Sequence, residues 1–69
     1  MRVLVIDGQG GGLGKSLVTA VKERFPLAEV LAVGTNAMAT GAMLRAGADQ
    51  AATGENAVVV AVSRADVIM

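Results

Sequence analysis

The fold of this protein is decided by one stretch close to its N-terminus, which reads Val3-Leu4-Val5-Ile6-Asp7-Gly8-Gln9-Gly10-Gly11-Gly12-Leu13-Gly14-Lys15-Ser16. Its first four residues form an uninterrupted apolar run, which is typical of a strand buried on both faces of a parallel sheet. Five of the ten residues from Asp7 to Ser16 are glycine. The stretch predicts a strand, a glycine loop (residues 8–14) and a helix, which is how many α/β folds begin.

The residues after the loop complete a first β-α-β unit. Apolar residues recur at helical spacing and predict an amphipathic helix from about Leu13 to Arg24. These apolar positions are Leu13, Leu17, Val18, Val21 and Phe25. Leu13 is expected to face the sheet and anchor the first turn, and Pro26 ends the helix. Residues 29–33 predict the second strand, so the unit spans about 33 residues.

A second helix is expected from Ala37 to Ala46. Thr35 or Asn36 is the expected N-cap, and Gly47 stands where a left-handed C-terminal cap is common. Gly41 in mid-helix costs about 1 kcal/mol relative to alanine, which indicates a role in packing or ligand clearance. Two methionines of this helix, Met38 and Met43, are expected to fill the core.

The last third of the chain has two readings. Residues 49–52 predict a short strand, residues 57–62 are rich in β-branched valine, and residues 67–69 are strand-like. Two parallel strands cannot be joined by the few residues between the last two runs. We therefore expect residues 55–63 to be a crossover helix, and a hairpin made from the same two runs is the alternative.

Together these elements predict a Rossmann-like three-layer α/β unit with a parallel sheet, in the order β-α-β-α-(short β)-α-β. Residues 1–69 are expected to be the N-terminal part of a single nucleotide-binding domain. Because the sequence ends on the apolar run Val67-Ile68-Met69, we expect a further C-terminal segment or a second copy in a homo-oligomer to cover the sheet edge.

The composition excludes several classes of function. The 69 residues include no Cys, His, Tyr or Trp, and 6 basic residues balance 6 acidic ones. Zinc–thiolate and zinc–imidazole sites and cysteine or histidine catalysis are therefore excluded, and no metal site or catalytic residue is assigned. A net charge of zero argues against nucleic acid and membrane surfaces as partners. The four-residue apolar run is too short for a signal peptide or a membrane span, so a cytoplasmic location is expected.

Glycine spacing in the loop indicates a phosphate ligand, because glycine lets a phosphate approach the backbone at the start of a helix. Gly8, Gly12 and Gly14 fit the pattern G-x-x-x-G-x-G of short-chain dehydrogenases, which bind NAD(P). The pattern G-x-G-x-x-G fails because residue 13 is leucine. A P-loop would match Gly14-Lys15-Ser16, but Gln9 replaces its first glycine, and the deviant P-loop of partition ATPases would need a lysine at Gly10. A tight turn without a ligand is the remaining alternative.

The expected ligand is thus a small nucleotide, with NAD(P) as the cofactor and ATP–Mg²⁺ as the alternative. The candidate binding residues are Asp7, Gly8, Gln9, Gly10, Gly11, Gly12, Leu13, Gly14, Lys15, Ser16, Gly34, Thr35, Asn36, Thr53, Glu55 and Asn56. Asp7 is expected to accept N–H groups of the loop rather than to bind a metal.

No carboxylate ends the second strand, where NAD sites carry Asp or Glu for the ribose. Thr35 and Asn36 stand there instead, so NADP fits better than NAD, although a helix cap explains these two residues equally well. Glu55 is the other acidic residue expected near the loop. Its placement at the start of a helix is by itself favourable, because of the helix dipole.

Three blocks of the sequence resemble a known family. They are Val5–Lys15, the run Gly34-Thr35-Asn36-Ala37, and the run Thr53-Gly54-Glu55-Asn56-Ala57. Together they are similar to a family of small bacterial proteins catalogued as domain of unknown function 3842. The resemblance covers essentially the whole chain and implies a Rossmann-like nucleotide-binding shape with the three blocks at its site. Family members continue past the last strand, and the family has no established activity to carry over. A nucleotide-sensing or assembly module without catalysis is a further alternative, because the chain has few reactive side chains.

Overall fold

A computed structural model describes all residues from 1 to 69 and contains four strands and three helices. They are β1 (Arg2–Asp7), α1 (Gly12–Arg24), β2 (Glu29–Gly34), α2 (Ala37–Arg45), β3 (Gln50–Thr53), α3 (Glu55–Val62) and β4 (Val67–Ile68). The order of elements is the one predicted from the sequence, and each boundary lies within one residue of its prediction.

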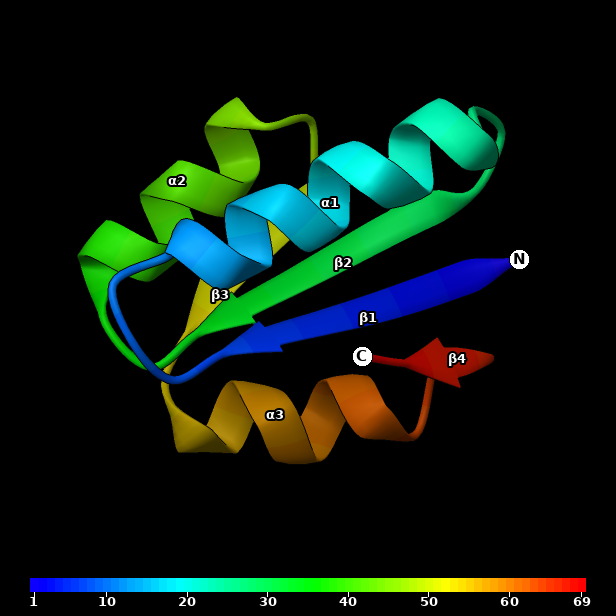
Figure 1. The fold of residues 1–69 in the computed structure, drawn as a ribbon. Helices are drawn as coiled ribbons and strands as arrows, with labels where there is room; N and C mark the ends of the chain where they lie inside the picture. Colours follow the sequence, from blue (N-terminus) through cyan, green and yellow to red (C-terminus); the bar gives the residue numbers. More distant parts are fainter.

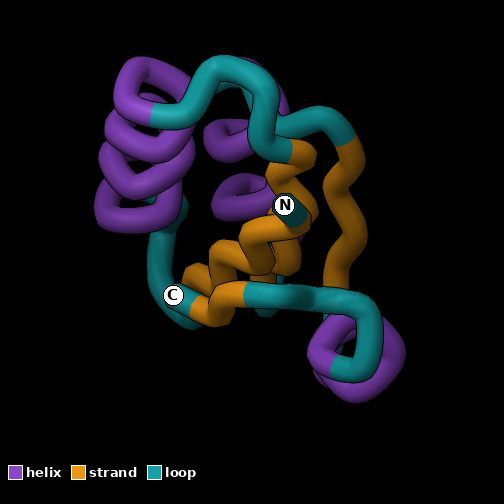
Figure 2. Tube along the Cα trace, turned by 90° about the vertical axis from the view of Figure 1, so that its right-hand side faces the viewer, coloured by secondary structure: helices purple, strands orange, loops and turns teal.

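The four strands form one parallel sheet with the order β3-β2-β1-β4. Helices α1 and α2 lie on one face of the sheet and α3 lies on the other, which gives three layers (Figure 1). Figure 2, turned by 90°, shows α3 apart from the other two helices with the strands between them. The Rossmann-like α/β unit expected from the sequence is confirmed.

The ambiguous segment after β3 is a helix, so the alternative hairpin is wrong. Helix α3 crosses the sheet beneath β2 and β1 and delivers the chain to β4, which pairs with β1. The predicted caps of α2 are also present. Asn36 Oδ1 accepts the N–H of Ala39 at 2.9 Å, and Gly47 has a φ of 116°.

The main core lies between the sheet and the α1–α2 layer. Its buried residues are Val3, Val5, Val18, Val21, Ala28, Val30, Ala32, Met43 and Ala48. The prediction that Met43 fills the core is confirmed, since its side chain is fully buried. The same prediction for Met38 is wrong, because the residue lies in the first turn of α2 on the solvent side and is 71% exposed.

The predicted orientation of α1 is wrong at both ends of the helix. Leu13 does not face the sheet but is 71% exposed, and Phe25 is 47% exposed. The buried stripe of α1 consists of Gly14, Val18 and Val21. Gly14 fits against Asp7 and Met43, and this close approach rotates Leu13 into solvent.

Two carboxylates, those of Asp49 and Asp66, make hydrogen bonds at the amino edge of the sheet, where the strands begin. Asp49 Oδ2 accepts the N–H of Val30 at 2.8 Å and the Nζ of Lys22 at 2.7 Å. Asp66 Oδ2, at the start of β4, accepts a hydrogen bond from the N–H of Arg2 at 2.8 Å.

None of the three helices has both the length and the apolar character that a membrane-spanning helix needs.

Candidate nucleotide site at the carboxyl edge of the sheet

The three blocks singled out in the sequence meet at the carboxyl edge of the sheet. Asp7 at the end of β1 pairs in register with Gly34 at the end of β2, and Gly34 pairs with Thr53 at the end of β3. The turns into α1, α2 and α3 therefore leave the sheet side by side (Figure 1). The chain turns toward β2 on one side of β1 and returns to β4 on the other, so the glycine loop stands where the strand order reverses. Ligands of open α/β sheets bind at such a position.

Asp7 holds the glycine loop in place from inside. Its side chain is buried, and its Oδ1 accepts the N–H of Gln9 at 2.7 Å while Oδ2 accepts the N–H of Gly14 at 2.8 Å. The N–H groups of Gln9 and Gly14 lower the pKa of the Asp7 carboxyl, and their effect exceeds that of burial, which acts in the opposite direction. The prediction that Asp7 braces the loop is confirmed.

Asn36 ties the glycine loop to α2. While its Oδ1 caps α2, its Nδ2 donates to the backbone oxygen of Gln9 at 2.8 Å. Both ends of the amide are thus used within the protein. Thr35 next to it is exposed, and its hydroxyl makes no hydrogen bond in the structure. Of the two residues expected to meet a ribose, Thr35 is the one with a free side chain.

The glycines at this edge fall into two groups. A Cβ on Gly11 would come within 2.8 Å of Ala42 Cβ, and one on Gly14 within 2.6 Å of Met43 Sδ. Gly11 also has a φ of 95°. A Cβ on Gly34 would meet the backbone nitrogen of Thr40 at 2.6 Å. Packing and backbone conformation account for these three glycines.

The other glycines of the loop have no such reason within the protein. A Cβ on Gly8, Gly10 or Gly12 would have no neighbouring atom within 4 Å, and none of the three has a positive φ. They leave an open strip of backbone beside the first turn of α1.

The first turn of α1 presents free hydrogen-bond donors. The N–H groups of Gly10, Gly12 and Leu13 have no acceptor within the protein. Helix N-termini carry a partial positive charge, so such donors suit an anion. The hydroxyl of Ser16 donates to the backbone oxygen of Gly12 at 3.1 Å. Lys15 is exposed on the side of α1 that faces α2, where it lines a hollow with Ala42, Arg45 and Ala46.

The block after β3 lies at the same edge but further from the loop, because β2 separates β3 from β1. Two strand spacings amount to about 10 Å. Thr53 Oγ1 is 2.7 Å from Thr40 Oγ1, and Thr40 is a residue that sequence reasoning missed. Glu55 and Asn56 are exposed, and neither side chain has a hydrogen bond or ion pair in the structure. No three acidic residues come together in a way that could hold a metal ion.

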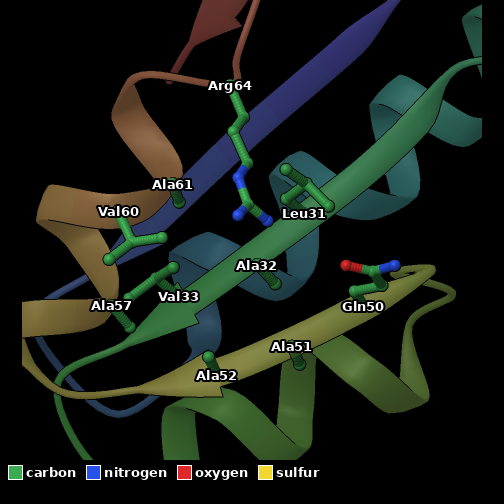
Figure 3. Close-up of a pocket in the computed structure, with 10 residues that line it drawn as sticks. All are labelled: Leu31, Ala32, Val33, Gln50, Ala51, Ala52, Ala57, Val60, Ala61 and Arg64. Carbon is green, nitrogen blue, oxygen red and sulfur yellow. The ribbon is translucent and has the colours of Figure 1, made fainter.

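A separate apolar groove lies on the other face of the sheet. It measures about 180 Å³ and runs between α3 and strands β2 and β3. Figure 3 shows Arg64 reaching across it beside Leu31, with Val60 and Ala61 on the wall formed by α3. The groove contains no residue of the glycine loop, so it is not part of the candidate phosphate site.

Comparison with known proteins identifies a family. The family model described as Domain of unknown function (DUF3842) matches residues 2–69. No curated protein matches the chain, and no solved structure matches it.

Proposed function

The chain belongs to the family Domain of unknown function (DUF3842), and we propose that it is a nucleotide-binding protein whose glycine loop holds the pyrophosphate of a dinucleotide, NAD(P). The observation that carries the proposal is the open strip formed by Gly8, Gly10 and Gly12. Neither packing nor backbone conformation requires glycine at these positions. A side chain there would obstruct a phosphate approaching the free N–H groups at the start of α1.

Several features favour a dinucleotide over a nucleoside triphosphate. The spacing of Gly8, Gly12 and Gly14 suits the dinucleotide pattern, whereas Gln9 breaks the P-loop pattern. Ser16, which would hold Mg²⁺ in a P-loop, directs its hydroxyl to Gly12 within its own helix. ATP–Mg²⁺ remains the alternative ligand of the proposal.

We propose that the protein binds a nucleotide, and we assign no reaction to it. The chain has no Cys, His or Tyr, and the one carboxylate in contact with the loop, that of Asp7, accepts N–H groups of the loop. This favours a role in sensing or assembly over catalysis. We place the protein in the bacterial cytoplasm, on its resemblance to small bacterial proteins and its lack of cysteine.

Thermal denaturation with NADH, NADPH, FAD and ATP–Mg²⁺ tests the proposal. A ligand at one hundred times its Kd should raise the melting temperature of a chain of this size by more than roughly 10 °C. Gly12→Val places a branched side chain in the open strip and should abolish the shift. Ala20→Val is the matched control, since Ala20 is exposed on the same helix away from the loop.

Each outcome is decisive. If none of the four nucleotides stabilises the wild-type protein, the proposal is wrong. If only ATP–Mg²⁺ stabilises the protein, the ligand is a nucleoside triphosphate and the dinucleotide proposal is wrong. An equal loss of the shift in Ala20→Val would show that the loop does not carry the binding.

A further inference from the structure

A second hollow lies directly beside the glycine loop. It measures about 290 Å³ and is lined by Lys15 of α1 and by Ala42, Arg45 and Ala46 at the end of α2. Ala42 is the residue against which Gly11 of the loop packs, so closely that a Cβ on Gly11 would lie only 2.8 Å from Ala42 Cβ. The hollow therefore adjoins the candidate pyrophosphate site.

Both cations at this hollow lack a partner. The two ion pairs of the protein join Arg2 to Glu29 and Lys22 to Asp49. Neither Lys15 nor Arg45 takes part in an ion pair or a side-chain hydrogen bond. An ammonium offers three donors and a guanidinium offers five in a planar fork, so together they suit a doubly charged phosphate.

Gly41 leaves room for the Arg45 side chain beside α2, because the three nearest atoms to a Cβ at Gly41 all belong to the Arg45 guanidinium. A Cβ on Gly41 would lie 3.2 Å from Arg45 Nη1, so the side chain folds back along α2 toward the N-terminus of that helix. That direction leads to the carboxyl edge of the sheet. Room for the guanidinium is the one packing feature found at this mid-helix glycine, whose helix propensity is unfavourable.

No carboxylate opposes an anion here. Glu29, Asp49 and Asp66 lie at the amino ends of β2, β3 and β4, which is the opposite edge of the sheet, and Glu23 lies in the last turn of α1 near the same edge. Asp7 is enclosed by its own N–H donors, and Glu55 begins the helix on the other face. The end of β2 is Gly34-Thr35-Asn36, with no acid to select an unsubstituted ribose.

We propose that Lys15 and Arg45 bind a phosphate monoester on the ribose of the nucleotide, which makes NADP(H) rather than NAD(H) the ligand. This inference rests on the proposed function, because the loop must hold the pyrophosphate of the same molecule. It adds the two side chains that choose between the phosphorylated and the unphosphorylated dinucleotide.

Isothermal titration calorimetry with NADPH and NADH tests the proposal, on wild type, Arg45→Ala and Lys15→Ala. The wild type should bind NADPH at least about tenfold more tightly than NADH, since hydrogen bonds to charged groups are among the strong ones. Each variant should lose most of that preference, and Arg45→Ala, which lies outside the glycine loop, should keep its affinity for NADH. Arg64→Ala is the matched control, because Arg64 is another exposed arginine without an ion pair but lines the groove on the opposite face.

Gly41→Ala tests the positioning of Arg45. Alanine favours the helix, so the fold should be as stable as the wild type or more stable. The affinity for NADPH should nevertheless fall, because the new methyl group would lie 3.2 Å from Arg45 Nη1 and shift the guanidinium. A purely structural glycine would leave the preference for NADPH unchanged.

The outcomes separate this inference from the proposed function. If NADPH and NADH bind equally well and Arg45→Ala changes neither, the inference is overturned while the proposed function stands. If neither dinucleotide binds, both fail. A parallel titration with inorganic phosphate tests whether the hollow binds a free phosphate ion instead of the phosphate of a nucleotide. Phosphate binding that Arg45→Ala removes, without any preference for NADPH, would assign the hollow to a free anion and overturn the inference.

Discussion

Asp7 links the end of the first strand to the glycine loop through the N–H of Gln9 and to the first turn of α1 through that of Gly14, so its charge should matter for stability. Replacing it with asparagine removes a charged acceptor from two N–H groups and should cost about 2 kcal/mol at pH 7. Urea denaturation with a constant m-value measures this loss. Glu23→Gln is the control, because Glu23 is exposed and makes no hydrogen bond.

The lowered pKa of Asp7 also fixes the direction of the pH dependence. Its folded pKa lies below the ordinary value of 3.8, so its stabilising contribution is complete above that value and is lost as the pH falls through the folded pKa. Asp49 behaves alike, since the hydrogen bond from Lys22 and then that from Val30 lower its pKa. The wild-type protein should therefore lose stability below about pH 4. Asp7→Asn should lose less on the same acidification, and an unchanged slope would contradict the assigned role.

Glycines of one loop should differ in what they contribute. Gly14→Ala brings a methyl group against Met43 and Asp7 and should destabilise the fold by about 1–3 kcal/mol, as overpacking does. Gly10→Ala meets no atom and should leave the fold unchanged or stabilise it by up to about 1 kcal/mol. Only Gly10→Ala should weaken nucleotide binding without a cost in stability. Equal destabilisation by the two variants, measured by urea denaturation, would mean that the whole loop serves the fold.

At the scale of elements, the sequence predicted the strands and helices well because their signals are local. The apolar runs, Pro26 and the cap residues Asn36 and Gly47 each act on neighbouring residues. Such local signals could not predict which face of α1 is buried, because that depends on the packing of Gly14 against Met43. Glycine was not among the apolar residues used to find the buried face of the helix. Thr40 was missed for a related reason, since its contact with Thr53 exists only once β3 lies beside β2.

Helix α3 should be the least protected helix of the fold. It has no buried side chain, its N-cap Gly54 provides no side-chain hydrogen bond, and four of its eight residues are valine. Helix α1, by contrast, buries Val18 and Val21. Native-state hydrogen exchange should therefore give low opening free energies for the amides of α3 and β4. The amides of α1 should have opening free energies close to the free energy of global unfolding. Equal protection of α3 and α1 would indicate that α3 is covered in solution.

The whole molecule combines a balanced charge with apolar surface on the α3 side. Its net charge is zero at neutral pH, so little repulsion keeps copies apart. Apolar side chains are exposed along α3 and β4, at Val59, Val60, Val62, Val67 and Ile68. The groove between α3 and strands β2 and β3 (Figure 3) lies on the same side of the sheet and is lined mostly by apolar residues. We expect copies of the chain to associate through these exposed apolar side chains.

Sedimentation velocity at several concentrations tests that expectation. The wild-type protein should associate as its concentration rises, because burial of exposed apolar surface is favourable. Val59→Lys adds one charge at a position of α3 that is 71% exposed and should reduce the association strongly. Leu27→Lys adds the same charge at a position that is 98% exposed, in the turn between α1 and β2, and serves as the control for charge alone. If both substitutions reduce the association equally, the reduction is due to net charge. If Leu27→Lys reduces it more, the copies do not associate through α3.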